Sequence, residues 1–212
     1  MKILIHTQGG SVGAFFQDNP ALAARILKGI QPAKAFTGDT ITIAGDYSLT
    51  AFVASRVNRV DLIAEDPPLW EHPTDILDVV ELSEADFLKR SHVNDPARLE
   101  RRRRPQRTGD LAVVFVELEM TGGDRIFLAA EIQVAVEVER LQRLHILLSA
   151  SALHFRLPQG GASILNLKNL IRFTFNPGPD VTPAGAWPAH HLSQRPGSGS
   201  IAEAMTVINP NP

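Results

Sequence analysis

Cysteine is absent from the 212-residue chain, which excludes disulfides, thiolate metal sites and a cysteine nucleophile. Long apolar runs are absent too: the longest, Leu111 to Val116, is far shorter than the about 20 residues of a membrane-spanning helix or the about 7 of a signal-peptide core. With one Tyr and two Trp, the chain has few side chains on which single-stranded nucleic acid could stack. The formal net charge of −2 argues against nucleic-acid binding over the whole surface. We therefore expect a soluble, cytoplasmic protein.

The first 92 residues alternate between strand and helix patterns. Residues 2–7 contain a short apolar run typical of a buried strand, and Asn19-Pro20 is typical of a helix start, with Asn as the N-cap. The alternating segment 40–44 predicts a strand, whereas apolar residues spaced along one helix face predict a helix over 46–60. We therefore expect a small β-α-β-α-β layer and assign 1–92 to an α/β subdomain.

Charged residues are segregated along the chain. Residues 61–86 contain nine acids and no Lys or Arg, and residues 89–107 contain eight bases against two acids. Within the acidic segment the pattern predicts a strand at 76–82, after which Ser83 is typical of the N-cap of a short helix. The basic segment includes Arg101, Arg102, Arg103, Arg104 and Arg107. Such a run is too polar for a core, so we assign 93–109 to an exposed Arg-rich connection.

Residues 110–175 are predicted to form an antiparallel β-meander. Segments 111–120 and 125–139 flank Thr121-Gly122-Gly123-Asp124, a typical hairpin turn, and the second segment alternates for longer than a usual strand. Two further strands are predicted at 144–157 and 165–175, and short connections favour antiparallel neighbours. A helix over 163–171 is the alternative for part of the last strand.

The last segment, 176–212, differs from the rest in composition. It holds seven of the fifteen prolines, which exclude regular structure over much of its length. We expect a non-regular tail that docks on its own domain or on a neighbouring subunit. The sequence shows no internal repeat at a fixed period. The predicted fold class is therefore α+β, with 1–92 and the meander packed as one compact domain.

A glycine-rich stretch follows the first strand. Gly9-Gly10-Ser11-Val12-Gly13 has the G-x-S-x-G pattern of a nucleophile elbow, in which a strained turn presents a serine hydroxyl to a histidine base. The alternative, which we favour, is a plain glycine turn that joins a strand to the next element.

The same stretch resembles the Gly-Gly-Ser-Val oxyanion loop of the Clp-type, crotonase-fold serine proteases. As in that family, Gly45-Asp46-Tyr47-Ser48 begins a predicted helix, and His72 follows at a suitable interval. The resemblance implies that the amides of Gly10 and Ser11 form the oxyanion hole, that Ser48 attacks, that His72 takes its proton and that Asp124 orients the base. In that family an α/β segment precedes the glycine loop, whereas here the loop begins at residue 9.

The sequence contains no metal-binding pattern. None of the seven histidines forms an HxH, HxxxH or HExxH spacing, so we expect neither a metal nor another cofactor. Glu117, Glu119, Glu131 and Glu137 flank one hairpin and could pair across strands. We interpret them as the solvent face of a half-buried sheet.

These observations favour a non-enzymatic, β-rich binding or self-assembling protein. The segregated charges and the tail would form the contacts of a homo-oligomer, with the Arg run pairing with the acidic segment of another copy. Nucleic acid or anionic lipid is the alternative partner for that run. Two alternative functions stay open. One is a serine hydrolase that uses Ser48 or Ser11 with His72, and the other is a membrane pore that uses the amphipathic hairpin 111–139.

Overall fold

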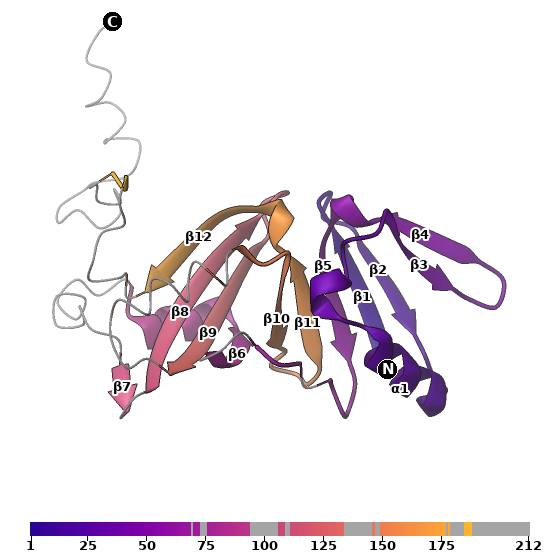
Figure 1. Cartoon of the computed structure of the whole chain (residues 1–212), viewed down its shortest axis with the longest axis horizontal. Helices are drawn as coiled ribbons and strands as arrows, with labels where there is room; N and C mark the ends of the chain where they lie inside the picture. The colour runs from indigo at the N-terminus through magenta and orange to yellow at the C-terminus, as the bar shows by residue number, and fades with distance from the viewer. Residues whose placement is uncertain are drawn as a thin grey trace, which may run out of the picture.

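The computed structural model describes residues 1–68, 70–72, 76–93, 106–108, 111–133, 146, 149–176, 178 and 185–187. These residues form an α+β structure dominated by one large mixed sheet (Figure 1). A separate two-stranded sheet and two short α-helices complete it. The coarse fold class predicted from the sequence is thereby confirmed. In the described part of the chain, neither α-helix has the length and apolar character needed to cross a membrane.

The main sheet runs in the order β12-β8-β9-β6-β10-β11-β5-β1-β2, with β7 attached to β8 and a separate β3–β4 hairpin beside it. The strands in chain order are β1 (Lys2–Thr7), β2 (Val12–Phe16), β3 (Thr40–Ala44), β4 (Leu49–Val53), β5 (Val57–Ile63), β6 (Ile76–Leu82), β7 (Gln106–Thr108), β8 (Leu111–Met120), β9 (Arg125–Gln133), β10 (Ala152–Arg156), β11 (Ala162–Asn166) and β12 (Leu170–Asn176). The helices are α1 (Pro20–Gly29) and α2 (Glu84–Ser91), and the 3-10 turns are η1 (Pro32–Lys34), η2 (Ala54–Arg56) and η3 (Leu167–Asn169).

Both α-helices begin at the capping residues expected from the sequence. The Asn19 side chain accepts hydrogen bonds from the backbone N–H groups of Ala21 and Leu22, and Ser83 accepts one from that of Asp86. Each bond satisfies an N–H that the first helical turn leaves without a partner. The strand predicted at 76–82 is also confirmed, as β6.

The helix predicted over 46–60 is wrong. This segment forms β4, then η2, then β5, with β4 paired to β3 across a turn that Gly45 closes by donating to the Ser48 carbonyl at 2.8 Å. The apolar residues fit a helix face, but they fit alternating strands equally well once the 3-10 turn shifts the phase between them. Half-buried Thr50 and Phe52 face inward from β4, while Leu49, Ala51 and Val53 face outward.

The prediction of a simple four-stranded meander is also wrong, because the strands do not pair in chain order. β8 and β9 form the expected hairpin as far as Gln133, while residues 134–139 of the predicted strand lie outside the described residues. β9 then pairs with β6 from earlier in the chain, and β10 pairs with β6 and β11. The predicted fourth strand is divided by η3 into β11 and β12, which lie in different parts of the sheet.

The chain contains two structural repeats. We call residues 1–63, with β1 to β5, the first repeat, and residues 111–176, with β8 to β12, the second repeat. The offset that takes Leu49 to Ala162 at the start of β4 and β11 also takes Val57 to Leu170 at the start of β5 and β12. β4–η2–β5 therefore corresponds residue for residue to β11–η3–β12.

Strand registers follow the same offset. β1 pairs Leu4 with Ala14 of β2, and β8 pairs Glu117 with Phe127 of β9 at the matching positions. β1 also pairs His6 with Arg59, as β8 pairs Glu119 with Arg172, and the register shifts at the same place in both pairs of strands. Because side chains alternate in a strand, a shared register means that matched residues lie on matched faces.

The glycine turns of the two repeats have the same hydrogen bonds. Gln8 donates to the Arg56 carbonyl at 3.0 Å, and its counterpart Thr121 donates to the Asn169 carbonyl at 2.8 Å. Gly10 and Gly123, also counterparts, both have positive φ. The Gly9-Gly10-Ser11 stretch is therefore a hairpin turn between β1 and β2, and no helix follows it directly.

Each repeat contributes its own hydrophobic cluster. One is built around Val116 and Leu118 of β8, the other around Ile3 and Ile5 of β1, which occupy matched positions. A third, smaller cluster packs Phe87 of α2 against the opposite face of β8 and β9. The two large clusters meet where β11 of the second repeat lies beside β5 of the first (Figure 1).

The two glycine turns also touch each other, which generates a test of how the repeats pack. A Cβ at Gly122 would overlap the carbonyl oxygen of Gln8, whereas nothing lies near Gly123; both residues have positive φ, of 101° and 90°. Both Gly→Ala variants therefore incur the backbone strain, and only Gly122→Ala adds the overlap. We expect Gly122→Ala to lower the free energy of unfolding by about 1–3 kcal/mol more than Gly123→Ala, measured by urea denaturation. Equal losses would contradict the close approach of the turns.

Candidate assembly interface

The junction between the repeats is an antiparallel strand pair. β11 pairs with β5 in a register that sets Ala162 opposite Leu62 and Ile164 opposite Val60. Every residue of β11 is buried, and Ile164 packs into the cluster of the first repeat while the next residue, Leu165, packs into that of the second. One strand thus contributes to both cores, so the repeats are joined by shared burial as well as by backbone hydrogen bonds.

Three buried asparagines hold the junction through the backbone. Asn166 and Asn169 both donate to the Val57 carbonyl, at 3.0 and 2.9 Å, and Asn58 donates to the Thr121 carbonyl at 2.7 Å. Each bond joins one repeat to the other. Because an unpaired buried amide is costly, these side chains help to define how the repeats fit together.

A buried ionic network lies at the same junction. Arg59 of β5 binds both oxygens of Glu81 of β6, at 2.5 and 2.7 Å, and Asp61 at 2.6 Å, while Asp61 also bonds to His6 at 2.9 Å. The guanidinium lies 5.3 Å from the ring centroid of Phe155, on the intervening strand β10. Burial alone would lower the pKa of Arg59, but its bonds to Glu81 and Asp61 outweigh that effect and raise it. Burial would likewise raise the pKa of Asp61, and the bonds from His6 and Arg59 lower it instead.

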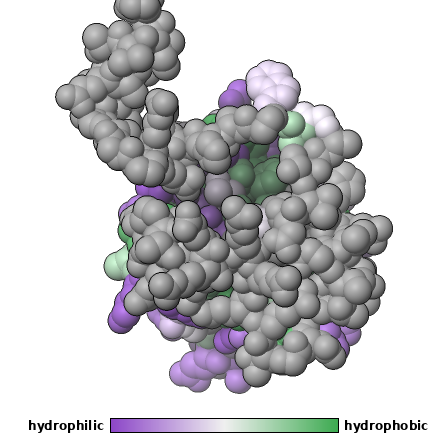
Figure 2. Space-filling view, turned by 90° about the vertical axis from the view of Figure 1, so that its left-hand side faces the viewer, coloured by the Kyte–Doolittle hydropathy of each residue, from purple (hydrophilic) through white to green (hydrophobic). Residues whose placement is uncertain are grey.

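In the described part of the chain, the strands that correspond to this junction at the two ends of the molecule each pair on one side only. β4 corresponds to β11 but pairs only with β3, and β12 corresponds to β5 but pairs only with β8 among the described residues. Their apolar side chains are exposed: 71% for Leu49, 55% for Val53, 62% for Ile171 and 43% for Phe173. The matched positions at the internal junction are Ala162, Asn166, Asn58 and Val60, all of which are buried. Figure 2 looks onto the β12 end and shows hydrophobic residues open to view between the grey parts.

We call these two strands the open edges. The sequence analysis missed them, because β4 was interpreted as part of a helix and β12 as the end of a meander. One signal could have revealed them: Gly9-Gly10 and Gly122-Gly123 each precede an arginine, Arg59 or Arg172, by the same interval.

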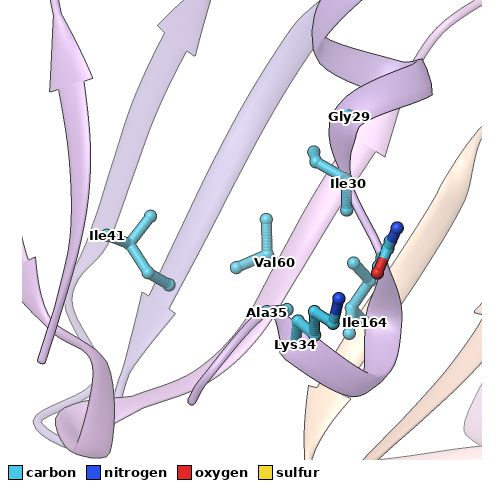
Figure 3. A pocket seen from close by; sticks show the side chains of 8 residues that line it. Gly29, Ile30, Lys34, Ala35, Ile41, Val60 and Ile164 are labelled. Carbon is cyan, nitrogen blue, oxygen red and sulfur yellow. The ribbon is translucent and has the colours of Figure 1, made fainter. Parts of the chain in front are cut away.

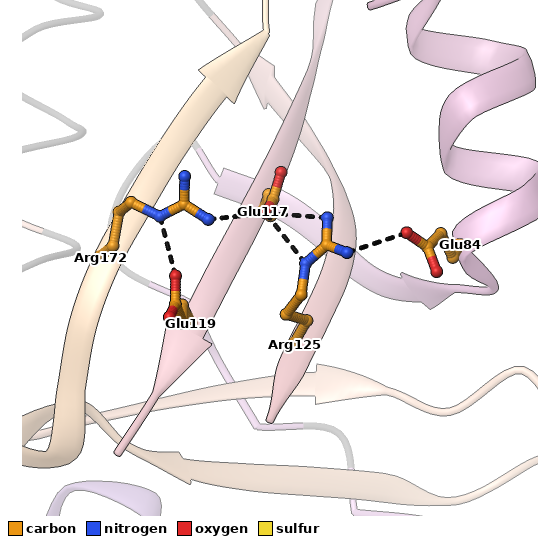
Figure 4. A network of polar contacts seen from close by, with 5 residues as sticks. All are labelled: Glu84, Glu117, Glu119, Arg125 and Arg172. Carbon is orange, nitrogen blue, oxygen red and sulfur yellow. Dashed lines mark hydrogen bonds and ion pairs between the residues drawn. The ribbon is translucent and has the colours of Figure 1, made fainter. Parts of the chain in front are cut away.

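An ionic network lies on the face of β12, β8 and β9 that α2 partly covers. Arg172 contacts Glu119 and Glu117, and Arg125 contacts Glu117 and Glu84 of α2 (Figure 4). Arg172 is the counterpart of Arg59, yet it is half exposed. Glu131 is exposed as expected for a solvent face, whereas the side chains of Glu117 and Glu119 are only 17% and 32% exposed. Glu137 lies outside the described residues.

A shallow apolar cavity of about 430 Å³ lies beside the junction in the first repeat (Figure 3). Its lining includes Ile30, Ile41, Val60 and Ile164, with the amine of Lys34 as its one charged group. With no carboxylate or histidine in its lining, the cavity offers no acid–base pair. Across the described residues, no group of three His, Asp or Glu side chains could hold a metal ion.

A pair of stacked histidines lies near the β6–β10 contact. The rings of His72 and His154 are 4.1 Å apart and nearly parallel, and the indole of Trp70 meets His154 edge-on. Burial, together with the neighbouring His154, lowers the pKa of His72 to about 4. Burial also lowers the pKa of His154. The pair is therefore neutral at physiological pH.

The four candidate catalytic residues have different contact partners and do not form one site. Ser11 bonds to Thr7 within the first glycine turn, Ser48 lies in the β3–β4 turn, His72 stacks on His154, and Asp124 accepts a 3.5 Å bond from Asn58. The structure records no hydrogen bond between any two of these four described residues. Arg101, Arg102, Arg103, Arg104 and the side chain of Arg107 lie outside the described residues.

Several acids of the segment 61–86 are paired within the chain. Asp61 and Glu81 bind Arg59, Asp78 binds Arg156, and Glu84 binds Arg125. Glu65, Asp66 and Glu71 are exposed. Only part of the acidic segment is therefore available to another molecule.

Comparisons with protein-family models, with curated proteins and with solved structures found no match. The case for a function consequently depends on the geometry alone.

The buried network predicts a large difference between two arginines. Arg59→Met leaves Asp61 and Glu81 as buried carboxylates without their cation, because Arg59 is 13% exposed and bonded to both. We expect a loss of about 3–5 kcal/mol in the free energy of unfolding. Arg125→Met is the control, since that side chain is 45% exposed, and we expect a change of at most about 1 kcal/mol. The free energy of unfolding of both variants is measured by urea denaturation. Similar losses in the two variants would show that the Arg59 network does not stabilise the fold.

The histidine pair predicts a dependence of stability on pH. The pKa of His72 is about 4 in the folded chain and ordinarily about 6.5, so the unfolded chain binds the proton first as pH falls. The contribution of His72 to stability should therefore drop between pH 6.5 and 4 by about 3 kcal/mol, and the lowered pKa of His154 acts in the same direction. The pKa values of Asp61 and Asp78 are lowered, so those groups act mainly below this window. In His72→Gln the slope between pH 6.5 and 4 should flatten, and an unchanged slope in denaturation curves would refute the assignment.

Proposed function

We propose that this chain is a non-enzymatic, self-assembling protein whose function is carried out as a homo-oligomer. The observation that carries the proposal is the pair of open edges. Strands that are buried at the junction inside the chain have counterparts at its two ends that are exposed and apolar. We favour a second copy as the partner, because β4 and β12 correspond to β11 and β5, which pair with each other inside the chain.

The chemistry of the edges supports a protein partner. β4 contains no charged residue, and β12 contains one, Arg172, which is paired with Glu119 and Glu117. Unpaired backbone N–H and C=O groups along a sheet edge bind another strand readily, and exposed apolar side chains gain from the burial. This surface fits neither a polar small molecule nor a phosphate backbone.

Further contacts are part of the proposal. The exposed acids Glu65, Asp66 and Glu71 would pair with the Arg-rich connection of another copy, and we propose that the segment 176–212 adds further contacts. The serine-hydrolase alternative gains no comparable support, because Ser48 and Ser11 have no hydrogen bond to His72 in the structure.

Sedimentation velocity and native mass measurement test the proposal. The wild-type chain should form a species of several copies at micromolar concentration. Val53→Asp places a charge on the open edge of β4 and should shift the protein toward single chains, with at least a tenfold weaker association constant. Leu22→Asp is the matched control, since Leu22 is an exposed leucine on α1, and it should leave the assembly intact. A wild-type chain that sediments as a single copy at all concentrations would refute the proposal.

A further inference from the structure

We propose that copies join head to tail: β12 of one copy pairs antiparallel with β4 of the next, in the register that β5 and β11 use inside the chain. This inference rests on the proposed function and specifies the contact through which the copies assemble. It follows from the correspondence of β4 with β11 and of β12 with β5, which strand bounds and registers both support.

The internal register translates directly into contacts between copies. Ala162 opposite Leu62 becomes Leu49 opposite Phe175, and Ile164 opposite Val60 becomes Ala51 opposite Phe173. Continued by two residues, the same register sets Val53 opposite Ile171. All three pairs lie on one face of the joined strands, because side chains alternate in a strand.

This face is apolar on both sides. Leu49, Ala51 and Val53 are exposed on β4, and Ile171 and Phe173 are exposed on β12, beside half-buried Phe175. At the internal junction, Ile164 lies opposite Val60, and both are medium-sized residues. At the matching position of the contact between copies, the small residue Ala51 lies opposite the large residue Phe173. The register therefore matches apolar with apolar at every position of this face, and it balances the sizes of the central pair.

The opposite face is also compatible. It sets Thr50 opposite Thr174, a pair that stabilises neighbouring strands, and Phe52 opposite Arg172. Phe52 packs in the cluster of its own repeat, as its counterpart Leu165 does in the second repeat. Each hairpin thus keeps one face for its own core and presents the other to a neighbour.

The arrangement of the repeats supports a head-to-tail contact in place of a two-fold one. In Figure 1 the β10–β11 hairpin lies on the right of the second repeat, against β5, and the β3–β4 hairpin lies on the right of the first repeat, at the outer end. β12 lies at the other end of the sheet (Figure 1). Within one chain the open edges are too far apart to meet, so each must be satisfied by a different copy. Such a contact produces a closed ring or an extended filament of repeats.

Engineered cysteines test the register, because the native chain has none. Thr50→Cys and Thr174→Cys are made in separate chains, mixed, allowed to assemble and oxidised. Paired strands hold Cα atoms about 4.5–5.5 Å apart, within the range of a disulfide. We expect a covalent dimer in the mixture, at least tenfold more than with either variant alone. Val53→Cys mixed with Ile171→Cys is a second pair, and circular dichroism confirms that each variant folds.

Controls separate this inference from the proposed function. Val12→Cys lies on the outer edge of β2 and should give no dimer with Thr174→Cys. A variant with both Thr50→Cys and Thr174→Cys should give a ladder of covalent multiples. If the chain assembles in sedimentation but both pairs cross-link no better than the controls, the head-to-tail register is refuted and self-assembly stands. If Thr50→Cys alone cross-links as well as the mixture, the contact is two-fold and the inference is also refuted. A chain that never assembles overturns both proposals.

Discussion

The pairing of β11 with β5 is the contact on which the arrangement of this molecule depends. It joins two repeats that are otherwise separate three-stranded units, β12-β8-β9 and β5-β1-β2, each with its own apolar cluster. Because Ile164 is buried in one cluster and Leu165 in the other, neither core is complete without this strand. The three asparagines and the Arg59 network add directional bonds at the same place, and these favour one relative position of the repeats over others.

Arg59 and Arg172 show how a neighbour changes the role of one residue type at matched positions. Inside the chain, Arg59 is enclosed by the strands of both repeats and neutralises two buried acids. At the end of the sheet, Arg172 faces solvent and contacts acids of the adjacent strand, which yields little stability in water. The difference in exposure between the two arginines arises from the neighbouring strand, because β5 has β11 beside it and β12 has no such neighbour among the described residues. The two strands themselves have matching bounds.

Local signals in the sequence predicted much of the secondary structure and little of the topology. Asn19 and Ser83 marked helix starts correctly because a cap acts within three residues. The segment 46–60 was misjudged because its apolar spacing suits a helix as well as two strands, and only the partner strands β3 and β1 decide between them. The repeat was hidden because it is preserved in strand register and turn geometry, while most matched positions hold different residues. Of the candidate site, the expectation of self-association was drawn from charge, whereas the geometry supports it through apolar strand edges that no sequence pattern marked.

Natural sheets usually protect their edges with charged residues, proline or bulges, since an open edge invites unwanted pairing. β4 has none of these, and the single charge of β12 is bound to acids of β8. At the equivalent internal contact the chain buries all four matched positions, Ala162, Asn166, Asn58 and Val60, whereas here Leu49, Val53, Ile171 and Phe173 are exposed apolar side chains. In the head-to-tail contact proposed above, β12 at one end of a copy pairs with β4 at the opposite end of the next copy. In the proposed contact every addition leaves one β4 edge and one β12 edge free, so these two edges are both paired only when the last copy meets the first. Under this proposal, copies joined as the two repeats are joined form a ring where the rotation between successive copies closes, and a filament where it does not.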